Sequence, residues 1–322
     1  MTFQYSVAMP VIQTNNLLIV GITCDNVAVA TPVHQIKDDA SMSEISVKKS
    51  VRYISSNHIT DTAPFAERLL FQTYKAKWQR REVVIKVAKV TEADEHGVQY
   101  EANLTRRLNH PNVIELLGTT SVKHKQLGVV IEYADDGSLE KWIGKIDQEQ
   151  QLQNIALGII SGLEYLHSKD VKVIHGNIKP TNILMFNDRR SDVIIPKIAD
   201  FGKSTYEGKC RSTANVGEQL YMAPEVRLNL AYSFTADIFS LAMTMFEMFN
   251  EELVLKSSDE VKRFILDVHT GRIAEMPNSW KVPQRLRNVI ESGWNENPVK
   301  RPELSQFENA LKGYFQQNMF VD

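Results

Sequence analysis

The chain has 322 residues, of which 43% are hydrophobic and 24% are charged, and its formal net charge is −2. This composition is typical of an ordinary soluble globular protein, and the length suits one large domain or two smaller ones. The near-neutral charge provides no basic surface for nucleic acid, and no apolar run is long enough to span a membrane.

Residues 1–50 are predicted to form an N-terminal extension before the main domain. Residues 17–22 and 27–33 are β-rich runs on either side of a polar turn at 23–26, and this pattern predicts a β-hairpin. The extension could be a partner-binding strand, a dimerising hairpin or a flap over a lobe. The sequence does not choose between these roles.

Residues 51–133 mostly have the pattern of β-strands. Residues 69–78 and 82–90 are rich in β-branched and aromatic side chains on either side of residues 79–81, which predicts a hairpin. A helix is predicted next, and Gly97 could delay its start by one turn. Two more strands are predicted at residues 113–119 and 126–133.

Residues 134–318 are predicted to be mainly helical. Apolar residues recur at helical spacing from Leu152 to Leu166, and residues 235–249 are apolar nearly all round, which predicts a helix buried at the centre. Shorter helices are predicted at residues 260–268, 283–292 and 303–314. The predicted fold is α+β with two lobes, a small β-rich N-lobe that carries one helix and a larger helical C-lobe.

The cysteines and histidines show no pattern of a metal site. Cys24 and Cys210 are far apart, which excludes a disulfide framework and favours a reducing compartment. No signal-peptide pattern opens the chain, so we expect a cytoplasmic location, or a nuclear one. His124, His167 and His269 lack a metal-ligand partner at i+4 or a notable carboxylate neighbour and are predicted to be surface or packing residues.

Two short motifs carry the functional signal. His175 begins the run H-G-N-I-K-P-T-N, which ends at Asn182, and a D-F-G run begins at Asp200. Protein kinases have H-R-D-x-x-x-x-N followed by D-F-G, so the chain resembles the protein kinase domain. Asn177 stands where kinases have the aspartate that accepts the proton of the substrate hydroxyl. An amide does not take up a proton near neutral pH, whereas a carboxylate can.

The resemblance runs from about residue 60 to 315 and is closest to the tyrosine-kinase-like group of Ser/Thr kinases. Its further landmarks are a V-A-I-K-like strand ending at Lys86, its partner Glu101, the gatekeeper Ile131 with the hinge residues Glu132 and Ala134, an A-P-E run ending at Glu225, the central-helix Asp237 and the late Arg301.

The resemblance implies a site for ATP and Mg²⁺. Lys86 would contact the phosphates and pair with Glu101, while Asn182 and Asp200 would hold Mg²⁺. Three residues would form the hinge side of the same nucleotide site: Ile131, Glu132 and Ala134. The alternative interpretation is that the charged residues persist as a buried ion-pair network without nucleotide.

The glycine-rich loop of kinases is missing. Alignment of the following strand places Ala66, Arg68 and Phe71 where G-x-G-x-x-G should stand. Glycine lets the backbone approach phosphates closely, so the bulky Arg68 and Phe71 predict a poor or blocked phosphate lid. Two alternatives stay open, because an insertion within residues 55–64 would shift this alignment and Arg68 could itself reach a phosphate.

Two further departures concern regulation and the floor of the site. Gly176 replaces the arginine that in many kinases receives a phosphorylated activation-loop residue, so activation in that usual manner is not expected. Glu218 stands where Ser/Thr kinases have a threonine that bonds the catalytic aspartate. Two carboxylates there would raise one pKa sharply, and Asn177 avoids this clash. Glu218 could instead pair with Lys179, which predicts a locked, non-catalytic floor.

The sequence therefore predicts a pseudokinase, a catalytically impaired kinase-like domain that acts as a signalling switch or scaffold. Its partners would be proteins, such as a kinase or signalling complex, and its oligomeric state is not predicted. The alternative is a Ser/Thr protein kinase of low or unusual activity, because a lost general base costs about 10²–10⁴-fold in rate. A scaffold without any nucleotide pocket is a third interpretation.

Overall fold

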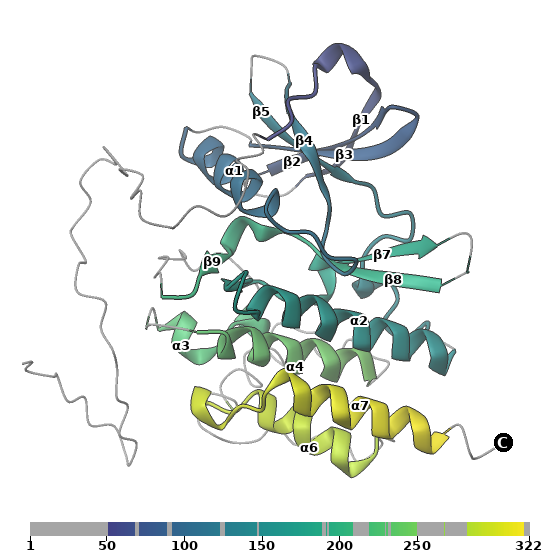
Figure 1. The fold of residues 1–322 in the computed structure, drawn as a ribbon, viewed down its shortest axis with the longest axis vertical. Coiled ribbons are helices and arrows are strands. Elements are labelled where there is room, and N and C mark those ends of the chain that lie inside the picture. Colours follow the sequence, from purple (N-terminus) through teal and green to yellow (C-terminus); the bar gives the residue numbers. More distant parts are fainter. Residues whose placement is uncertain are drawn as a thin grey trace, which may run out of the picture.

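In the computed structural model the chain has a β-sheet region followed by a helical region, and this confirms the predicted α+β fold class. Figure 1 shows the sheet and its helix above the helical region. The structure describes residues 51–67, 71–88, 92–122, 126–146, 148–188, 191, 193–208, 219–228, 230, 233–249, 267 and 282–318. The predicted N-terminal hairpin, both cysteines and all of the predicted helix at 260–268 except Asp267 lie outside these residues. The domain boundaries remain predictions.

The N-lobe contains a five-stranded antiparallel sheet in the order β1-β2-β3-β5-β4. Its strands are β1 (Ile59–Glu67), β2 (Phe71–Trp78), β3 (Arg81–Ala88), β4 (Leu116–Ser121) and β5 (Leu127–Glu132). The hairpin of β2 and β3 confirms the prediction from the sequence. The turn is one residue shorter than the predicted 79–81, because Arg81 already pairs with Trp78. Its two residues, Gln79 and Arg80, both have positive φ.

Strand β1 was not predicted from the sequence, for a reason that its pairing explains. Its register with β2 shifts between Thr60 and Ala63 and again between Pro64 and Ala66, so the strand has no regular alternation. Most of its residues are exposed, and an edge strand tolerates proline. Residues 55–64 form a short 3₁₀ helix, η1 (Ser56–His58), and most of β1.

Helix α1 (Glu92–Thr105) packs against β3, β4 and β5. Its face toward the sheet includes Val98, Glu101 and Leu104, all buried, as their spacing predicts. Gly97 lies inside the helix, so it does not delay the helix start. The buried Glu101 therefore projects from a helix into the space next to the sheet.

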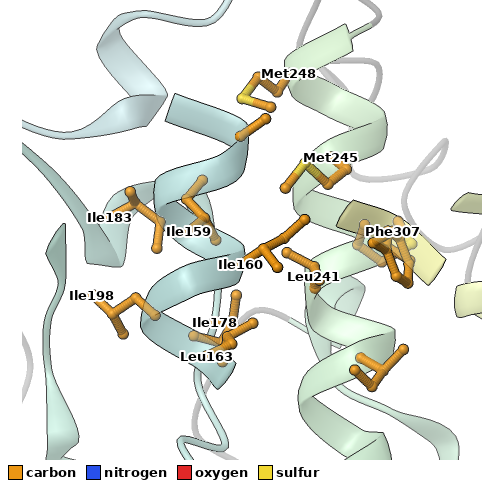
Figure 2. Close-up of a cluster of buried hydrophobic side chains, with 14 of the residues drawn as sticks. Ile159, Ile160, Leu163, Ile178, Ile183, Ile198, Leu241, Met245, Met248 and Phe307 are labelled. Carbon is orange, nitrogen blue, oxygen red and sulfur yellow. The ribbon is translucent and has the colours of Figure 1, made fainter. Parts of the chain in front are cut away.

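The C-lobe is built on helix α4 (Thr235–Phe249), in which every residue from Ala236 to Phe249 is buried. Figure 2 shows Ile160 of α2 pointing toward Leu241 of α4, while Leu163 lies beside Ile178 in the same core. The methionines of α4 are core residues, as predicted. Among the residues that the structure describes, the C-lobe also contains the helices α2 (Glu149–His167), α3 (Pro224–Arg227), α6 (Gln284–Gly293) and α7 (Leu304–Asn318).

Two short antiparallel pairs position the functional motifs. β6 (Val173–Ile174) pairs with β9 (Thr205–Tyr206), and β7 (Ile183–Asp188) pairs with β8 (Val193–Ile198). The loop from His175 to Asn182 lies between β6 and β7, while Asp200 follows β8, so the two pairs bring both motifs to one place. Within the described part of the chain, no helix has the length and apolar character needed to cross a membrane.

Candidate functional site

Lys86, Glu101 and Asp200 meet in one ion-pair cluster, in which Lys86 pairs with Glu101 as the resemblance implies. The Lys86 Nζ lies 2.7 Å from Oε2 of Glu101 and 2.6 Å from Oδ1 of Asp200. Lys86 comes from β3, Glu101 from α1 and Asp200 from the turn after β8, so the cluster joins the two lobes. Burial alone would lower the pKa of Lys86, but the carboxylates of Asp200 and Glu101 outweigh it and raise this pKa, so the ammonium stays charged.

Burial acts in the opposite direction on Glu101. It raises the pKa of the Glu101 carboxyl, although the Lys86 ammonium counteracts part of this effect. The cluster therefore sets one ammonium against two carboxylates that are themselves partly desolvated. It carries no surplus positive charge with which to attract an anion.

The D-F-G turn adopts an unusual backbone conformation. Asp200 has φ 69° and ψ 68°, in the left-handed region that aspartate tolerates better than most residues. The next side chain, Phe201, is buried and meets the ring of His175 edge-on, with 4.9 Å between ring centroids. This turn directs the Asp200 carboxylate toward Lys86 while Phe201 enters the core.

Asn177, at the position of the catalytic base, is bonded to the predicted metal ligands. Its side-chain Nδ2 donates to Oδ2 of Asp200 over 3.2 Å, and its backbone carbonyl accepts from Nδ2 of Asn182 over 2.8 Å. Asn182 is almost fully buried. The structure thus brings Asn177, Asn182 and Asp200 together, but the group that faces Asp200 is an N–H donor rather than a proton acceptor.

The loop itself is held by Asp237, at the start of α4. Its carboxylate accepts from the backbone N–H of His175 over 2.8 Å and from that of Gly176 over 2.7 Å. His167 Nε2 lies 2.9 Å from the same carboxylate. Burial alone would raise the pKa of Asp237, but His167 and the neighbouring donors outweigh it, so this pKa lies below its ordinary value. The expectation that His167 has no carboxylate neighbour is therefore wrong.

The resemblance identifies the stretch from Asp200 to Glu225 as the activation segment, and two hydroxyls near its start are closed to modification. Ser204 and Thr205 are buried, and Ser204 Oγ donates to the carbonyl of His175 over 2.9 Å. Tyr206 differs, because its hydroxyl accepts from Nη1 of Arg107, just beyond the end of α1, over 3.4 Å. The Arg107 guanidinium therefore lies beside Tyr206, although position 176, where many kinases have an arginine, is a glycine.

The hinge residues lie where their resemblance predicts, at the end of β5. Ile131 pairs with Val84 of β3 and is half-buried between the two lobes. The Glu132 carboxylate binds Lys197 of β8, with both oxygens within 2.8 Å of Nζ, and also accepts from the backbone N–H of Glu115. This clamp between Glu132 and Lys197 joins the hinge to the C-lobe, and sequence reasoning missed it.

Aromatic side chains flank the outer side of the hinge. Phe65 of β1 meets the ring of Tyr133 edge-on, with 5.8 Å between centroids, and is 52% exposed. Lys75 Nζ lies 3.9 Å from the centroid of the same Tyr133 ring. Ala134 follows and is nearly buried. Phe65 was not identified from the sequence, because the irregular strand β1 was not predicted.

Phe71, which the sequence alignment places at the last glycine of the phosphate loop, has its side chain over the lysine of the cluster. Lys86 Nζ is 4.4 Å from the centroid of the Phe71 ring. The ring also packs against a small core between the sheet and α1 that includes Ala88, Val98 and Val129. Ala66 lies near the end of β1, and Arg68 falls outside the described residues. The poor or blocked phosphate lid expected from the sequence stays a prediction.

The predicted pair of Lys179 with Glu218 is not tested by the structure. Lys179 directly precedes the 3₁₀ helix η4 (Pro180–Asn182), whereas Glu218 lies outside the described residues. The locked floor therefore stays a prediction. Within the described part of the chain, no group of three or more His, Cys, Asp or Glu side chains could hold a metal ion without further ligands.

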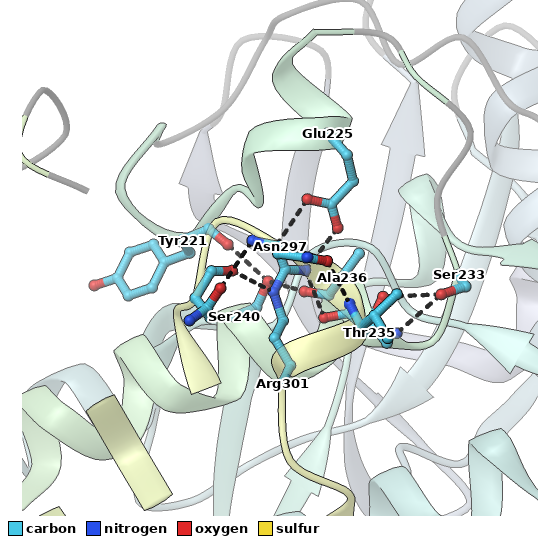
Figure 3. A network of polar contacts seen from close by, with 10 residues as sticks. Tyr221, Glu225, Ser233, Thr235, Ala236, Ser240, Asn297 and Arg301 are labelled. Carbon is cyan, nitrogen blue, oxygen red and sulfur yellow. Dashed lines mark hydrogen bonds and ion pairs between the residues drawn. The ribbon is translucent and has the colours of Figure 1, made fainter. Parts of the chain in front are cut away.

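A second polar network supports the site from below. Figure 3 shows the guanidinium of Arg301 facing the carboxylate of Glu225, with the carbonyl of Thr235 nearby. Nη1 and Nη2 of Arg301 each contact one oxygen of Glu225, over 2.6 Å and 2.8 Å. The pairing inferred from the resemblance is confirmed. It fixes α3, where the activation segment ends, to the base of the C-lobe.

Comparison with known proteins agrees with this geometry. The family model described as Protein kinase domain matches residues 71–312, more than half of the chain. A probable serine/threonine-protein kinase of Dictyostelium discoideum is 29% identical over 266 residues, which are 80% of this chain and 28% of that protein. A serine/threonine/tyrosine-protein kinase of Arabidopsis thaliana is 28% identical over 262 residues, 78% of this chain and 65% of that protein.

Mitogen-activated protein kinase kinase kinase 7 of Drosophila melanogaster is 29% identical over 242 residues, which are 74% of this chain and 34% of that protein. The chain therefore spans less than two thirds of the length of each of these relatives.

Proposed function

This chain belongs to the protein kinase domain family, and we propose that within it the chain acts as a pseudokinase, a signalling switch or scaffold without efficient phosphotransfer. The observation that carries the proposal is the hydrogen bond from Asn177 Nδ2 to Asp200 Oδ2, 3.2 Å long. A general base must accept a proton from the attacking hydroxyl in the transition state. Asn177 instead directs N–H hydrogens at Asp200 and has no basic atom.

The ion-pair cluster of Lys86, Glu101 and Asp200 supports the proposal that this domain acts as a switch. Lys86, Glu101 and Asp200 make short contacts between β3, α1 and the D-F-G turn. These elements move relative to one another in kinases that switch between states. A protein partner that binds α1 or the activation segment would shift this equilibrium by its differential affinity for the two states.

The test is incorporation of labelled γ-phosphate into a generic peptide and into the protein itself. We expect the wild-type chain to give the same background as Asp200→Ala. Turnover of about 1–100 s⁻¹, which is typical of protein kinases, would overturn the proposal if Asp200→Ala abolishes it. Thermal unfolding of both proteins checks that each is folded.

The second candidate is a Ser/Thr protein kinase of low or unusual activity. The names of the relatives favour it, because they describe protein kinases. Phosphoryl transfer depends mainly on positioning and on charge stabilisation, so loss of the base leaves a barrier increase of about 3–5 kcal/mol. Wild-type activity that exceeds Asp200→Ala but stays about 10²–10⁴-fold below ordinary turnover would support this candidate.

A further inference from the structure

We infer that Tyr206 is a phosphorylation site whose phosphate is received by Arg107, so that the modification fastens helix α1 to the start of the activation segment. The inference rests on the proposed function, since it names a covalent signal for the proposed switch and a partner that delivers it, a tyrosine kinase. It differs from the arrangement of many kinases, in which an arginine at the position of Gly176 receives the phosphate.

The first step is that Tyr206 can be reached. Ser204 and Thr205 are almost fully buried, whereas Tyr206 is half-buried and its hydroxyl lies at the surface. Strand β9 is held to β6 by only two residue pairs, and Glu207 and Gly208 beyond it are exposed. A short strand at such a place opens locally at a lower free energy than the whole fold. A partner kinase can therefore bind the tyrosine.

The modification is a phosphoryl transfer in which ATP is supplied by the partner kinase. The Tyr206 phenol oxygen attacks the γ-phosphorus of ATP and forms a new P–O bond, while the bond from that phosphorus to the bridging oxygen breaks and ADP leaves. The phenol proton passes to the catalytic base of the partner. The reaction uses no catalytic group of this chain, so Asn177 does not hinder it.

Arg107 is placed to receive the product. Its Nη1 donates to the neutral Tyr206 hydroxyl over 3.4 Å, which is long for a hydrogen bond. A phosphotyrosine carries about −1.5 to −2 charges at pH 7 and three strong acceptor oxygens, and a guanidinium can bind two such oxygens at once. Arg107 is exposed, so its side chain can shift to fit the larger group. Phosphorylation therefore turns a weak neutral contact into a charge-assisted one.

The new ion pair would act on the side of α1 that already contacts the activation segment. The hydroxyl of Tyr100 donates to the backbone carbonyl of Ser204 over 3.1 Å. Tyr100 and Arg107 are close to two helical turns apart in the sequence, so both contacts lie on one side of the helix. Glu101 follows Tyr100 and pairs with Lys86. A stronger contact at Arg107 therefore also holds α1 where this pair forms.

Two negative groups oppose the phosphate. Glu207 follows Tyr206 in the chain, and the carbonyl groups at the end of α1 carry a partial charge of roughly half an elementary charge. Glu207 is exposed, so water and salt screen its effect, and salt also screens the helix end. Arg107 makes direct contact with the phosphate oxygens and carries a full charge. The attraction by Arg107 therefore exceeds both repulsions.

The experiment compares the full chain with and without phosphotyrosine at position 206, introduced during translation by stop-codon suppression. We expect the phosphate to raise the midpoint of thermal unfolding by about 2–4 °C and to slow hydrogen exchange of the amides in the last turn of α1. Both effects should disappear in Arg107→Gln, because glutamine keeps a polar side chain without the charge. They should weaken in about 1 M NaCl, where the Debye length is about 3 Å.

Two controls separate this contact from a general effect of charge. Phosphotyrosine at position 53 adds the same charge at a residue that is 61% exposed and pairs with β4 rather than with the activation segment. Its effect should be the same with and without Arg107→Gln. Arg80→Gln removes an exposed arginine from the turn between β2 and β3, and it should leave the effect of the phosphate at position 206 unchanged.

Three results would overturn the inference. The first is a chain with phosphotyrosine at position 206 that does not fold, or that unfolds at the same or a lower temperature than the unmodified chain. The second is a stabilisation that persists in Arg107→Gln. The third is a tyrosine kinase domain that, with ATP, phosphorylates Tyr53 completely and leaves Tyr206 unmodified, as located by mass spectrometry. None of them touches the pseudokinase proposal, because that proposal fails only if this chain itself transfers labelled phosphate at ordinary turnover.

Discussion

Arg301 and Glu225 form a bidentate ion pair that is almost completely shielded from water, although they lie 76 residues apart. Removing one partner leaves an uncompensated buried charge. We therefore expect Glu225→Ala to lower the free energy of unfolding by about 3–5 kcal/mol, measured by urea denaturation. The control is Lys312→Ala, which breaks the solvent-exposed pair with Glu308 and should cause no measurable loss. Equal effects of the two substitutions would contradict the role assigned to Arg301.

The second prediction concerns the base position. Asn177→Asp places a carboxylate beside Asp200 where an amide now donates a hydrogen bond, so repulsion should raise the pKa of one of the two groups. We expect this single reversion to restore little phosphotransfer, and the double variant Asn177→Asp, Glu218→Thr to restore more. Incorporation of labelled phosphate measures both. High activity of the single variant would show that positions 177 and 218 are not coupled.

The third prediction concerns the backbone before Asn177. Gly176 has φ 69°, and a Cβ there would lie 3.2 Å from the carbonyl oxygen of Lys203. Gly176→Ala should therefore destabilise the protein by about 1–2 kcal/mol. Gly97→Ala is the matched control, because it lies in helix α1 with no atom within 4 Å of the added Cβ. That change should stabilise the protein by about 0.5–1 kcal/mol, and thermal unfolding of both variants checks the opposite signs.

The fourth prediction concerns acid stability. His175 is buried, its Nε2 lies 3.1 Å from the carbonyl of Ala199, and its Nδ1 accepts from the N–H of Asn177. A neutral ring with its proton on Nε2 satisfies both contacts, and burial lowers the pKa of His175 below its ordinary value, although the nearby Asp237 and Asp200 oppose this effect. Below about pH 6.5 the unfolded chain binds a proton that the folded chain does not, so stability falls.

This loss should reach at most about 1.4 kcal/mol per pH unit for the single proton. Urea denaturation between pH 7 and pH 5.5 measures the slope, which His175→Gln should reduce. The exposed His58 provides the control, because His58→Gln should leave the slope unchanged. An identical slope in wild type and His175→Gln would exclude His175 as its source. The lowered pKa of Asp237 acts in the same direction, but only as the pH falls further into the carboxyl range.

The sequence predicted the elements whose residues form a local pattern. The uninterrupted apolar run of α4 and the paired runs of β2 and β3 needed no knowledge of distant contacts. The cluster of Lys86, Glu101 and Asp200 was also predictable, because kinase motifs mark each member separately. Strand β1 was not, since two register shifts remove its alternation.

The features that were not predicted from the sequence are contacts between residues far apart in the chain. His167 and Asp237 are 70 residues apart, and no spacing in the sequence relates them. The clamp between Glu132 and Lys197 is missing from the sequence interpretation for the same reason. The sequence showed that Phe71 is bulky, but the direction of its ring depends on the register of β2 with β3 and on the packing of α1.

The support that Asp237 gives to His175 and Gly176 has a consequence for how such a protein can evolve. Both bonds are made to main-chain N–H groups, so the loop keeps its course whichever side chain stands at position 177. The side chain at position 177 can therefore change while the hydrogen bonds from His175 and Gly176 to Asp237 stay in place. A family with this arrangement can change the residue at the catalytic position and retain its architecture.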